Sequence, residues 1–335
     1  MSLTHFTPRF LTEAINDIKV PKTPLYDRVF RRREESPAEY VDFEIITGSE
    51  KLPKFVARGV EAHVREKQGL KVVTFRIPSI REKKEFQAAD ILAQRAAAGS
   101  IITNPGDLKE AADRKAMSEL EDFKRMMNRG KEWMCAQALT GSLSISGKGV
   151  DMAIDYGVAS THKPVLAGAA KWDDSAPDII ANIRAWKKLV AKSGYKATDC
   201  ILGSTAATYF INNADVKALL NNRNIVAGQM ELNSNSDYLG TILGIRFWEN
   251  DNEYKDEAGN DTPYVAATAA IMYAEEAPFK FWHGPVDDFD ANFGVFEFFS
   301  KTYRVQDPSV DWLLVATAPV PVIHNANALV YATVA

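Results

Sequence analysis

The chain has 335 residues, of which 46% are hydrophobic and 25% are charged. This length allows several subdomains around a shared core, and the composition excludes a disordered or collagen-like protein. The net charge of −4 gives no broad basic surface for gripping nucleic acid. The only cysteines, Cys135 and Cys200, belong to no Cys-x-x-Cys or Cys/His cluster, so we expect two small buried hydrophobes and neither a zinc site nor a disulfide.

No targeting or membrane-spanning segment is predicted. The opening MSLTHFTPRFLTEAINDIKV interleaves charges with apolar residues and lacks the unbroken apolar core of a secretory signal. The longest apolar runs, such as WLLVATAPVPVI, are far shorter than the roughly 20 residues that cross a bilayer. We therefore expect a protein that is soluble or assembled.

A proline-punctuated segment comes first. The stretch YDRVFRRREE lies among prolines, and residues 1–39 are predicted to form an extended N-terminal arm. Arg31–Arg33 could contact phosphate, but Glu34 and Glu35 follow directly and cancel most of the field. This favours a solvated or subunit-contacting charge cluster.

Two strands are predicted next. YVDFEII (40–46) and LKVVTFRI (70–77) both alternate apolar and polar residues with the two-residue period of a half-buried strand. The segment between them is rich in glycine, proline and charge and has little to build a core of its own. Residues 40–80 should therefore form a protruding hairpin loop whose apolar face needs a partner surface.

Two helices are predicted after Pro78. REKKEFQAADILAQRAAAG suggests a helix that ends near Gly99. A longer helix over residues 107–140 has apolar residues at helical spacing and a candidate capping box of Asp107 and Glu110. It would span roughly 50 Å, which is typical of a spine that crosses more than one subdomain.

The middle of the chain predicts a mixed α and β subdomain. SLSISGKGVDMAIDYG predicts a hairpin that turns at Gly147–Gly149. A helix capped by Ser175 should stop at Gly194, the run CILG should be a buried strand, and Ser204 should open another helix that ends near Asn213. The polar residues 221–236 are interpreted as a loop.

Strands dominate the C-terminal third. TILGIRFW and PYVAATAAIMYA should flank a solvated acidic tip, ENDNEYKDEAGNDT, and GVFEFFSKTYRV and VDWLLVATA predict two further strands. Pro319 and Pro321 should end the pairing of the last of these, because proline cannot donate to a ladder. The final ALVYATV can then return to another sheet.

The sequence offers no catalytic constellation. GSLSISGKG fails as a phosphate-binding loop because its glycine spacing is wrong and Gly149 stands where Ser or Thr is required. In HGPVDDFD, a metal or acid/base cluster is the alternative to an ordinary Asp-rich turn, and the turn is favoured because no second histidine follows at a ligand spacing. A triad assembled in space stays open. The HGPVDDFD cluster comprises His283, Asp287, Asp288 and Asp290, and the other histidines, His5, His63, His162 and His324, are scattered singly.

The order of elements and several blocks of sequence resemble the lambda-type major capsid proteins of tailed phages, the phage major capsid protein E family. The likeness begins at TPLYDRVFRRRE, continues through LPKFVARGVEAHV and LKVVTFRIPSIREKKEFQAADILAQR, and includes VDMAIDYG, the long DIIANIRAWKKLVAKSGYKATDCILGSTAATYFINNADVKALL and the closing APVPVIHNANALVYATV. It covers nearly the whole chain from about Pro21.

The resemblance implies an α+β tailed-phage capsid fold with an N-terminal arm, an extended β-hairpin loop, a long spine helix, and peripheral and axial subdomains. The arm would be 1–39 and the hairpin loop 40–80. The peripheral subdomain would be 81–174, with the spine at 107–140. Residues 175–310 would be mainly axial, and 311–335 would return to the core sheets.

The resemblance also implies a structural subunit that self-assembles through pentamers and hexamers into an icosahedral head around double-stranded DNA, with no catalytic residue, cofactor or metal. Scaffold, portal and decoration proteins would be partners, and the shell would assemble in the host cytoplasm. An encapsulin-like compartment with protein cargo, or an enzyme using the His283 region, are the alternatives. The expected intersubunit contacts on the hairpin are Val41, Phe43, Lys54, Phe55, Arg58, Lys71, Val73, Phe75 and Arg76.

Overall fold

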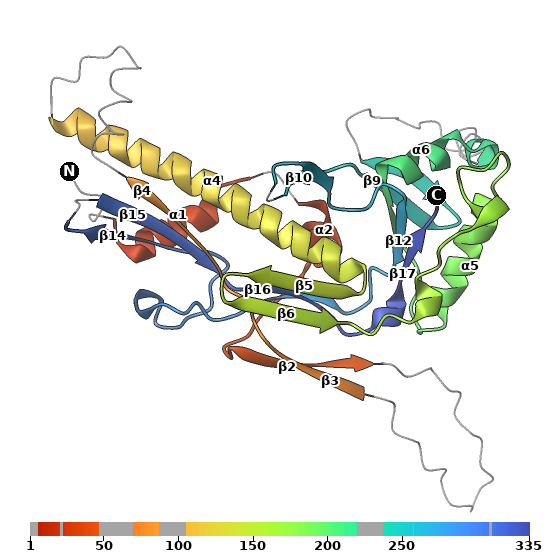
Figure 1. Ribbon diagram of the computed structural model, residues 1–335, viewed down its shortest axis with the longest axis horizontal. Coiled ribbons are helices and arrows are strands. Elements are labelled where there is room, and N and C mark those ends of the chain that lie inside the picture. Colours follow the sequence, from red (N-terminus) through yellow and green to blue (C-terminus); the bar gives the residue numbers. More distant parts are fainter. Residues whose placement is uncertain are drawn as a thin grey trace, which may run out of the picture. The chain divides into compact units, whose positions relative to one another are not determined.

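The computed structural model describes residues 6–20, 23–46, 70–86, 105–219, 237–256, 258–307 and 310–335 (Figure 1). The chain divides into two compact units. Unit 1 comprises Met1–Val41, Thr74–Glu132 and Lys280–Pro321, and unit 2 comprises Asp42–Val73, Trp133–Phe279 and Val322–Ala335. Each unit is therefore built from segments that are far apart in the sequence. Within the described residues, no helix is long and apolar enough to cross a membrane.

Unit 1 places helices against an antiparallel sheet with the strand order β14-β15-β4. Its core combines apolar side chains from α1, from α4 and from the sheet, among them Leu11, Leu120 and Leu313, all fully buried. The elements are α1 (Pro8–Asp17), α2 (Pro24–Arg28), β1 (Arg32–Glu35), β4 (Ile80–Phe86), α4 (Pro105–Leu139, which continues into unit 2), β13 (Phe279–His283), β14 (Phe299–Val305), β15 (Val310–Thr317) and β16 (Pro319–Ile323).

The N-terminal segment is folded rather than extended, which corrects the predicted arm. Thr7 caps α1 by accepting a hydrogen bond from the Phe10 amide, and Leu11 and Ile15 enter the core on one face of the helix. Strand β1 pairs in parallel with β13. The prolines begin helices here, since Pro8 and Pro24 each occupy the first turn, where no amide donor is needed.

Residues 80–86 form strand β4, so the helix predicted from REKKEF is wrong at this end. The pairing with β15 runs from Thr317↔Ile80 to Asp311↔Phe86. Arg, Glu and Lys favour helices, but the backbone ladder along β15 overrides that weak preference. The charged side chains of β4 are exposed, as suits an edge strand. The rest of the predicted helix, 87–99, lies outside the described residues.

Unit 2 is built on a five-stranded sheet with the order β17-β12-β7-β9-β8. Helix α5 packs on β12 and β17, and α6 packs on β7 and β9. The strands are β7 (Asp199–Gly203), β8 (Tyr238–Ile242), β9 (Ile245–Asn250), β12 (Ala269–Tyr273) and β17 (Leu329–Thr333), the helices are α5 (Ile179–Ala191) and α6 (Ser204–Asn212), and two small hairpins pair β5 (Ser142–Gly147) with β6 (Val150–Asp155) and β10 (Glu253–Lys255) with β11 (Asp261–Pro263).

Several predicted elements are confirmed in unit 2. The β5–β6 hairpin turns at Gly149, which has a φ of +80° that favours glycine. The predicted run CILG is fully buried in β7, the acidic segment holds the β10–β11 hairpin, and Gly194 lies just past the end of α5 with a φ of +83°. Both cysteines are buried and neither forms a disulfide, and burial raises the pKa of the Cys200 thiol.

Two local predictions are wrong in unit 2. Asp178, rather than Ser175, caps α5 by accepting from the Ala181 amide at 2.8 Å. TILGIRFW is two strands, because Leu243 and Gly244 both adopt positive φ and make a two-residue hairpin turn. The predicted end of pairing before the prolines is confirmed, because β15 stops at Thr317. Pro319 and Pro321 then lie in β16, the edge strand of a different sheet, β1-β13-β16, where prolines are tolerated.

We expect that deleting residues 329–335 makes the protein insoluble. The deletion removes β17, exposes the edge of β12, and loses buried side chains such as Leu329 and Val330, each worth about 1.5–3 kcal/mol. The measurement is the soluble fraction after expression, with deletion of Ala335 alone as the control. A soluble truncated protein that still assembles would contradict this structural role for the terminus.

A second prediction concerns Gly203, where a Cβ atom would lie 2.2 Å from the backbone oxygen of Ala266 and 2.7 Å from that of Ala267. Backbone atoms cannot move aside cheaply, so Gly203→Ala should lower the free energy of unfolding by about 1–3 kcal/mol. Gly147→Ala is the matched control, because a Cβ there meets nothing within 4 Å. Urea denaturation of both variants measures the difference, and equal stabilities would refute the close approach.

Candidate functional site

The predicted hairpin exists as the pair β2 (Tyr40–Ile46) and β3 (Leu70–Arg76). Val41 and Phe75 are only 6% and 7% exposed in the single chain, so these two side chains need no second subunit to cover them. Arg76 forms an ion pair with Glu39 and is more than half exposed. The other predicted contacts cannot be placed. The side chains of Phe43, Lys71 and Val73, and all of Lys54, Phe55 and Arg58, lie outside the described residues.

The charge cluster at residues 31–35 is largely paired within the chain. Arg33 donates to Asp27 at 2.9 Å and lies 4.5 Å above the Tyr26 ring. Glu34 binds Lys280 at 2.7 Å and accepts from the Trp282 indole at 3.0 Å. The Arg33 contacts join β1 to α2, and the Glu34 contacts join β1 to β13. These two charges therefore hold the N-terminal segment in unit 1 and are not left for binding phosphate.

Two charged residues on the buried face of α4, Glu132 and Lys131, bind this N-terminal segment. The Glu132 carboxylate accepts from the backbone amides of Leu25 and Tyr26 at 2.8 and 2.9 Å. Both residues lie in the first turn of α2, where backbone amides have no partner within the helix. Glu132 is 1% exposed, so the carboxylate satisfies donors that water cannot reach.

The neighbouring Lys131 is fully buried and makes a compensating ion pair. Its ammonium lies 3.0 Å from a Glu297 oxygen and 3.8 Å from the centre of the Phe298 ring. The Tyr26 hydroxyl donates to Glu297 at 3.2 Å and lies 3.4 Å from His283 Nε2. One buried cation therefore connects α4 to the segment before β14 and, through Glu297 and Tyr26, to α2 and β13.

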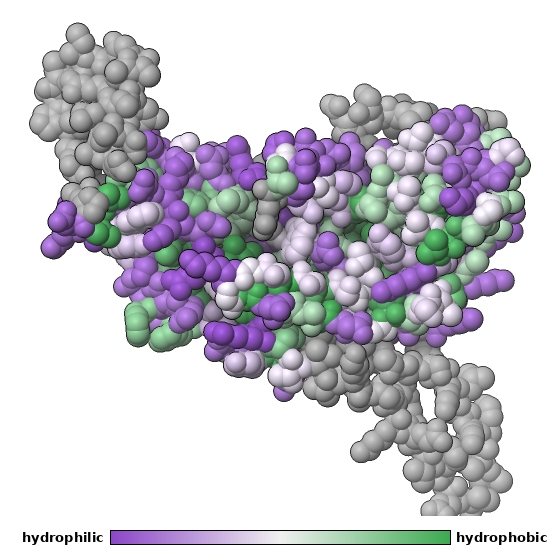
Figure 2. Space-filling view, viewed as in Figure 1, coloured by the Kyte–Doolittle hydropathy of each residue, from purple (hydrophilic) through white to green (hydrophobic). Residues whose placement is uncertain are grey.

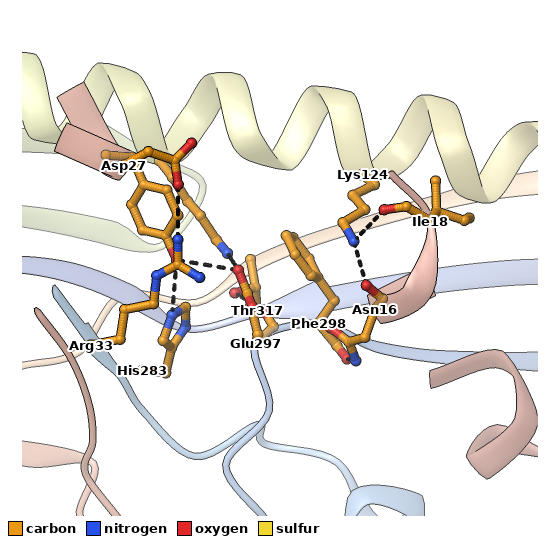
Figure 3. Close-up of polar contacts among 11 residues, drawn as sticks. Asn16, Ile18, Asp27, Arg33, Lys124, His283, Glu297, Phe298 and Thr317 are labelled. Atoms are coloured by element: carbon orange, nitrogen blue, oxygen red, sulfur yellow. Dashed lines mark hydrogen bonds and ion pairs between the residues drawn. The ribbon is translucent and has the colours of Figure 1, made fainter. Parts of the chain in front are cut away.

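Lys124 adds a third anchor further along α4 (Figure 3). Its ammonium donates to the backbone oxygens of Asn16 and Ile18, both at 2.7 Å. A lysine at a helix C-terminus satisfies carbonyls that have no partner within the helix. The end of α1 is also fixed to Phe298, whose backbone oxygen accepts from the Asn16 side chain at 3.1 Å.

Burial shifts the proton affinities of this group. It raises the pKa of Glu132 to about 7 and lowers the pKa of Lys131 to about 8, because both charged forms lose water. Burial, and then the Lys131 charge, lower the pKa of His283 to about 3. Burial alone would raise the pKa of Glu297, but the charge of Lys131 and its hydrogen bond lower it. The shifts follow from the burial of these side chains and from their contacts with one another in unit 1.

The HGPVDDFD carboxylates serve the loop between β13 and β14. Asp288 accepts from the Asp290 amide and pairs with Lys301 at 2.7 Å, and Lys301 also pairs with Asp290 at 2.7 Å. Arg81 lies 3.4 Å from Asp288 and donates to the Asp287 backbone oxygen. Across the described residues, no group of three or more His, Cys, Asp or Glu side chains is placed to hold a metal ion.

Sequence reasoning missed Lys131, Glu132 and Glu297. One signal could have found Lys131: Leu120, Phe123, Met127 and Met134 follow one apolar stripe of α4, and Lys131 interrupts it four residues after Met127. A lysine in such a stripe must be buried and paired. Its partner Glu297 is 166 residues away, and no local pattern indicates that distance.

Replacing Glu132 by Gln should change how stability depends on pH. Between about pH 4.5 and 7 the folded chain binds a proton at Glu132 that the unfolded chain lacks. Binding of this proton stabilises the folded state at pH 5, and the stabilisation is lost by pH 8. The unfolding free energy of the wild type, relative to Glu132→Gln, should therefore fall by roughly 3 kcal/mol between these pH values. His283 titrates in both proteins and cancels.

Denaturant titrations at pH 5 and pH 8 measure this difference. Glu121→Gln removes one carboxylate from the partly exposed side of the same helix and is the control. A Glu132→Gln difference from wild type that is the same at both pH values would show that the carboxylate is not held in a buried setting.

The model of the family "Phage major capsid protein E" matches residues 7–334. The search of curated proteins found no match. Among solved structures, the prophage capsid protein of E. coli CFT073 superimposes with a TM-score of 0.71 at 17% identity and covers 98% of this chain and 99% of its own.

Two further structures share the fold at lower similarity. A phage-related protein from Bordetella bronchiseptica RB50 has a TM-score of 0.54 at 12% identity, over 97% of this chain and 95% of its own. The mature capsid of bacteriophage PhiM1 gives 0.53 at 10% identity, over 95% and 89%. At these identities the superpositions show the fold, while the family is shown by the match over residues 7–334: the chain belongs to the phage major capsid protein E family.

Proposed function

We propose that this protein is the major capsid protein of a tailed phage or prophage, and that it self-assembles through pentamers and hexamers into an icosahedral shell around double-stranded DNA. Membership of the capsid family makes it a structural subunit of the phage head and a component of the virion. The family match over residues 7–334 is the observation that carries the proposal, since it leaves little of the chain for another activity.

The structural role agrees with what the charged side chains do. In unit 1 the buried Lys131 and Glu132 hold backbone and neighbouring side chains. In unit 2 Arg246 binds Asp199 at 2.6 Å and also contacts Glu275. The charges of Lys131, Glu132 and Arg246 are all used in contacts that stabilise the fold. We therefore propose that the protein is not an enzyme, and a catalytic role for the His283 region is not favoured.

The finer partners are part of the proposal. Scaffold, portal and decoration proteins would join the shell in the host cytoplasm, and the hairpin would reach a neighbouring subunit. Packaged DNA would be held without sequence-specific contacts, because the net charge of −4 offers no strong general attraction for phosphates. Weak contacts repeated across many subunits would sum into a stable shell.

Electron microscopy of the purified chain, concentrated in a crowding agent, tests the proposal. We expect closed shells, tubes, or five- and six-fold rings. Monomers that persist even when the chain is co-expressed with the other head proteins of its phage would contradict it. Shells that co-purify with an enzyme in place of DNA would instead indicate a protein-cargo compartment.

A further inference from the structure

Helix α5 carries a row of unpaired positive charges. Ile179, Ile183, Trp186 and Val190 bury one face of the helix, while Arg184, Lys188 and Lys192 follow each other at four-residue spacing and are exposed. Among the described residues, none of these three cations lies within ion-pair distance of a carboxylate. Like charges four apart destabilise a helix. The helix dipole accounts for Lys192 at the C-terminal end but not for Arg184 in the middle.

Unit 2 also carries a crowded group of carboxylates around the end of β9 and the start of β10. Asp237, Asp251 and Glu253 are exposed, and the Glu249 amide donates to the Asp237 backbone oxygen at 2.7 Å. Burial, and then the charges of Asp251 and Asp237, raise the pKa of Glu249. In the described part of the chain no lysine or arginine forms an ion pair with Asp237, Glu249, Asp251 or Glu253. The neighbouring Lys255, whose pKa is raised by its hydrogen bond to Asp261 and also by the charge of Glu253, offsets only part of their repulsion.

The two charged surfaces lie on opposite flanks of the same sheet. Figure 1 shows α5 beyond β12 and β17 on one side, and β10 beyond β9 on the other. Hydrophilic residues cover the region of β10 in Figure 2. A body with opposite charges on opposite flanks can dock its basic flank on the acidic flank of an identical body. Such head-to-tail contacts are heterologous, and they close into rings when the rotation per subunit permits.

We propose that Arg184, Lys188 and Lys192 of one subunit dock on Asp237, Asp251 and Glu253 of a second copy. This inference rests on the proposed function and deepens it by naming one contact through which subunits join. Opposite potentials across the contact would steer the encounter and fix the register. Duplex DNA could also attract three cations, but the cluster of exposed carboxylates on the same unit favours a second copy of the chain.

Charge reversal in two sets tests the contact. The helix set is Arg184→Glu, Lys188→Glu and Lys192→Glu, the carboxylate set is Asp237→Lys, Asp251→Lys and Glu253→Lys, and the swapped variant carries both. We expect each set alone to reduce the yield of closed shells at least tenfold, and the swapped variant to recover to within about threefold of wild type, because opposite charges again face each other. Circular dichroism verifies that each variant is folded.

The control for net charge reverses three cations elsewhere in unit 2, Lys148→Glu, Lys171→Glu and Lys217→Glu, and should leave the shell yield within about threefold of wild type. Failure of the swapped variant to recover, or normal shells from the helix set, would overturn the proposal. So would a helix set that assembles normally but loses affinity for duplex DNA, which would assign the row to nucleic acid.

A second measurement separates this inference from the proposed function. In sedimentation velocity, the helix-set and carboxylate-set variants should each stay unassociated alone and associate when mixed, because each then meets its opposite charge. Association of the mixture without shells from the wild type would support the contact while contradicting the capsid role. A mixture that fails to associate would overturn the contact whether or not the wild type forms shells.

Discussion

The burial of two adjacent charges on α4 is the constraint on which unit 1 depends. An isolated charge in a protein interior is costly, and removing one partner of a buried pair is more damaging than never having built the pair. Lys131 therefore requires Glu297, and Glu132 requires the Leu25 and Tyr26 amides. If α2 moved away, the almost fully buried Glu132 carboxylate would lose both of its amide donors. Helix α4 thus holds the N-terminal segment through the hydrogen bonds and ion pair of its buried charges as well as through apolar packing.

This arrangement suits a subunit whose work is to present surfaces at fixed positions. Thr12 and Ser300 hold α1 against β14, and Lys124 closes the end of α1. Segments from both ends of the chain therefore share one core in unit 1. In unit 2 the C-terminal strand β17 extends the sheet that carries α5 and α6. A shell subunit needs such rigidity, because small errors in each contact accumulate over a closed surface.

The elements that could be predicted from the sequence are those with a clear local pattern of apolar residues. The long helix, the β5–β6 hairpin, the buried β7 and the returning β17 all follow from local apolar spacing and glycine turns, and the family resemblance supplied the function. Residues 80–86 were misjudged because partner strand β15 outweighs local helix preference. The N-terminal segment was misjudged because prolines open its helices rather than exclude them. The buried charges could not be located, since their partners lie more than a hundred residues away.

Amide hydrogen exchange at residues 23–30 tests the central claim most directly. If Glu132 and Lys131 hold α2 in the core, the amides of Leu25 and Tyr26 open only when unit 1 unfolds. The account predicts that a peptide covering these residues exchanges as slowly as one from the central strand β15. Exchange within seconds at Leu25 and Tyr26, while β15 stays protected, would show that the N-terminal segment is not anchored by the buried charges of α4.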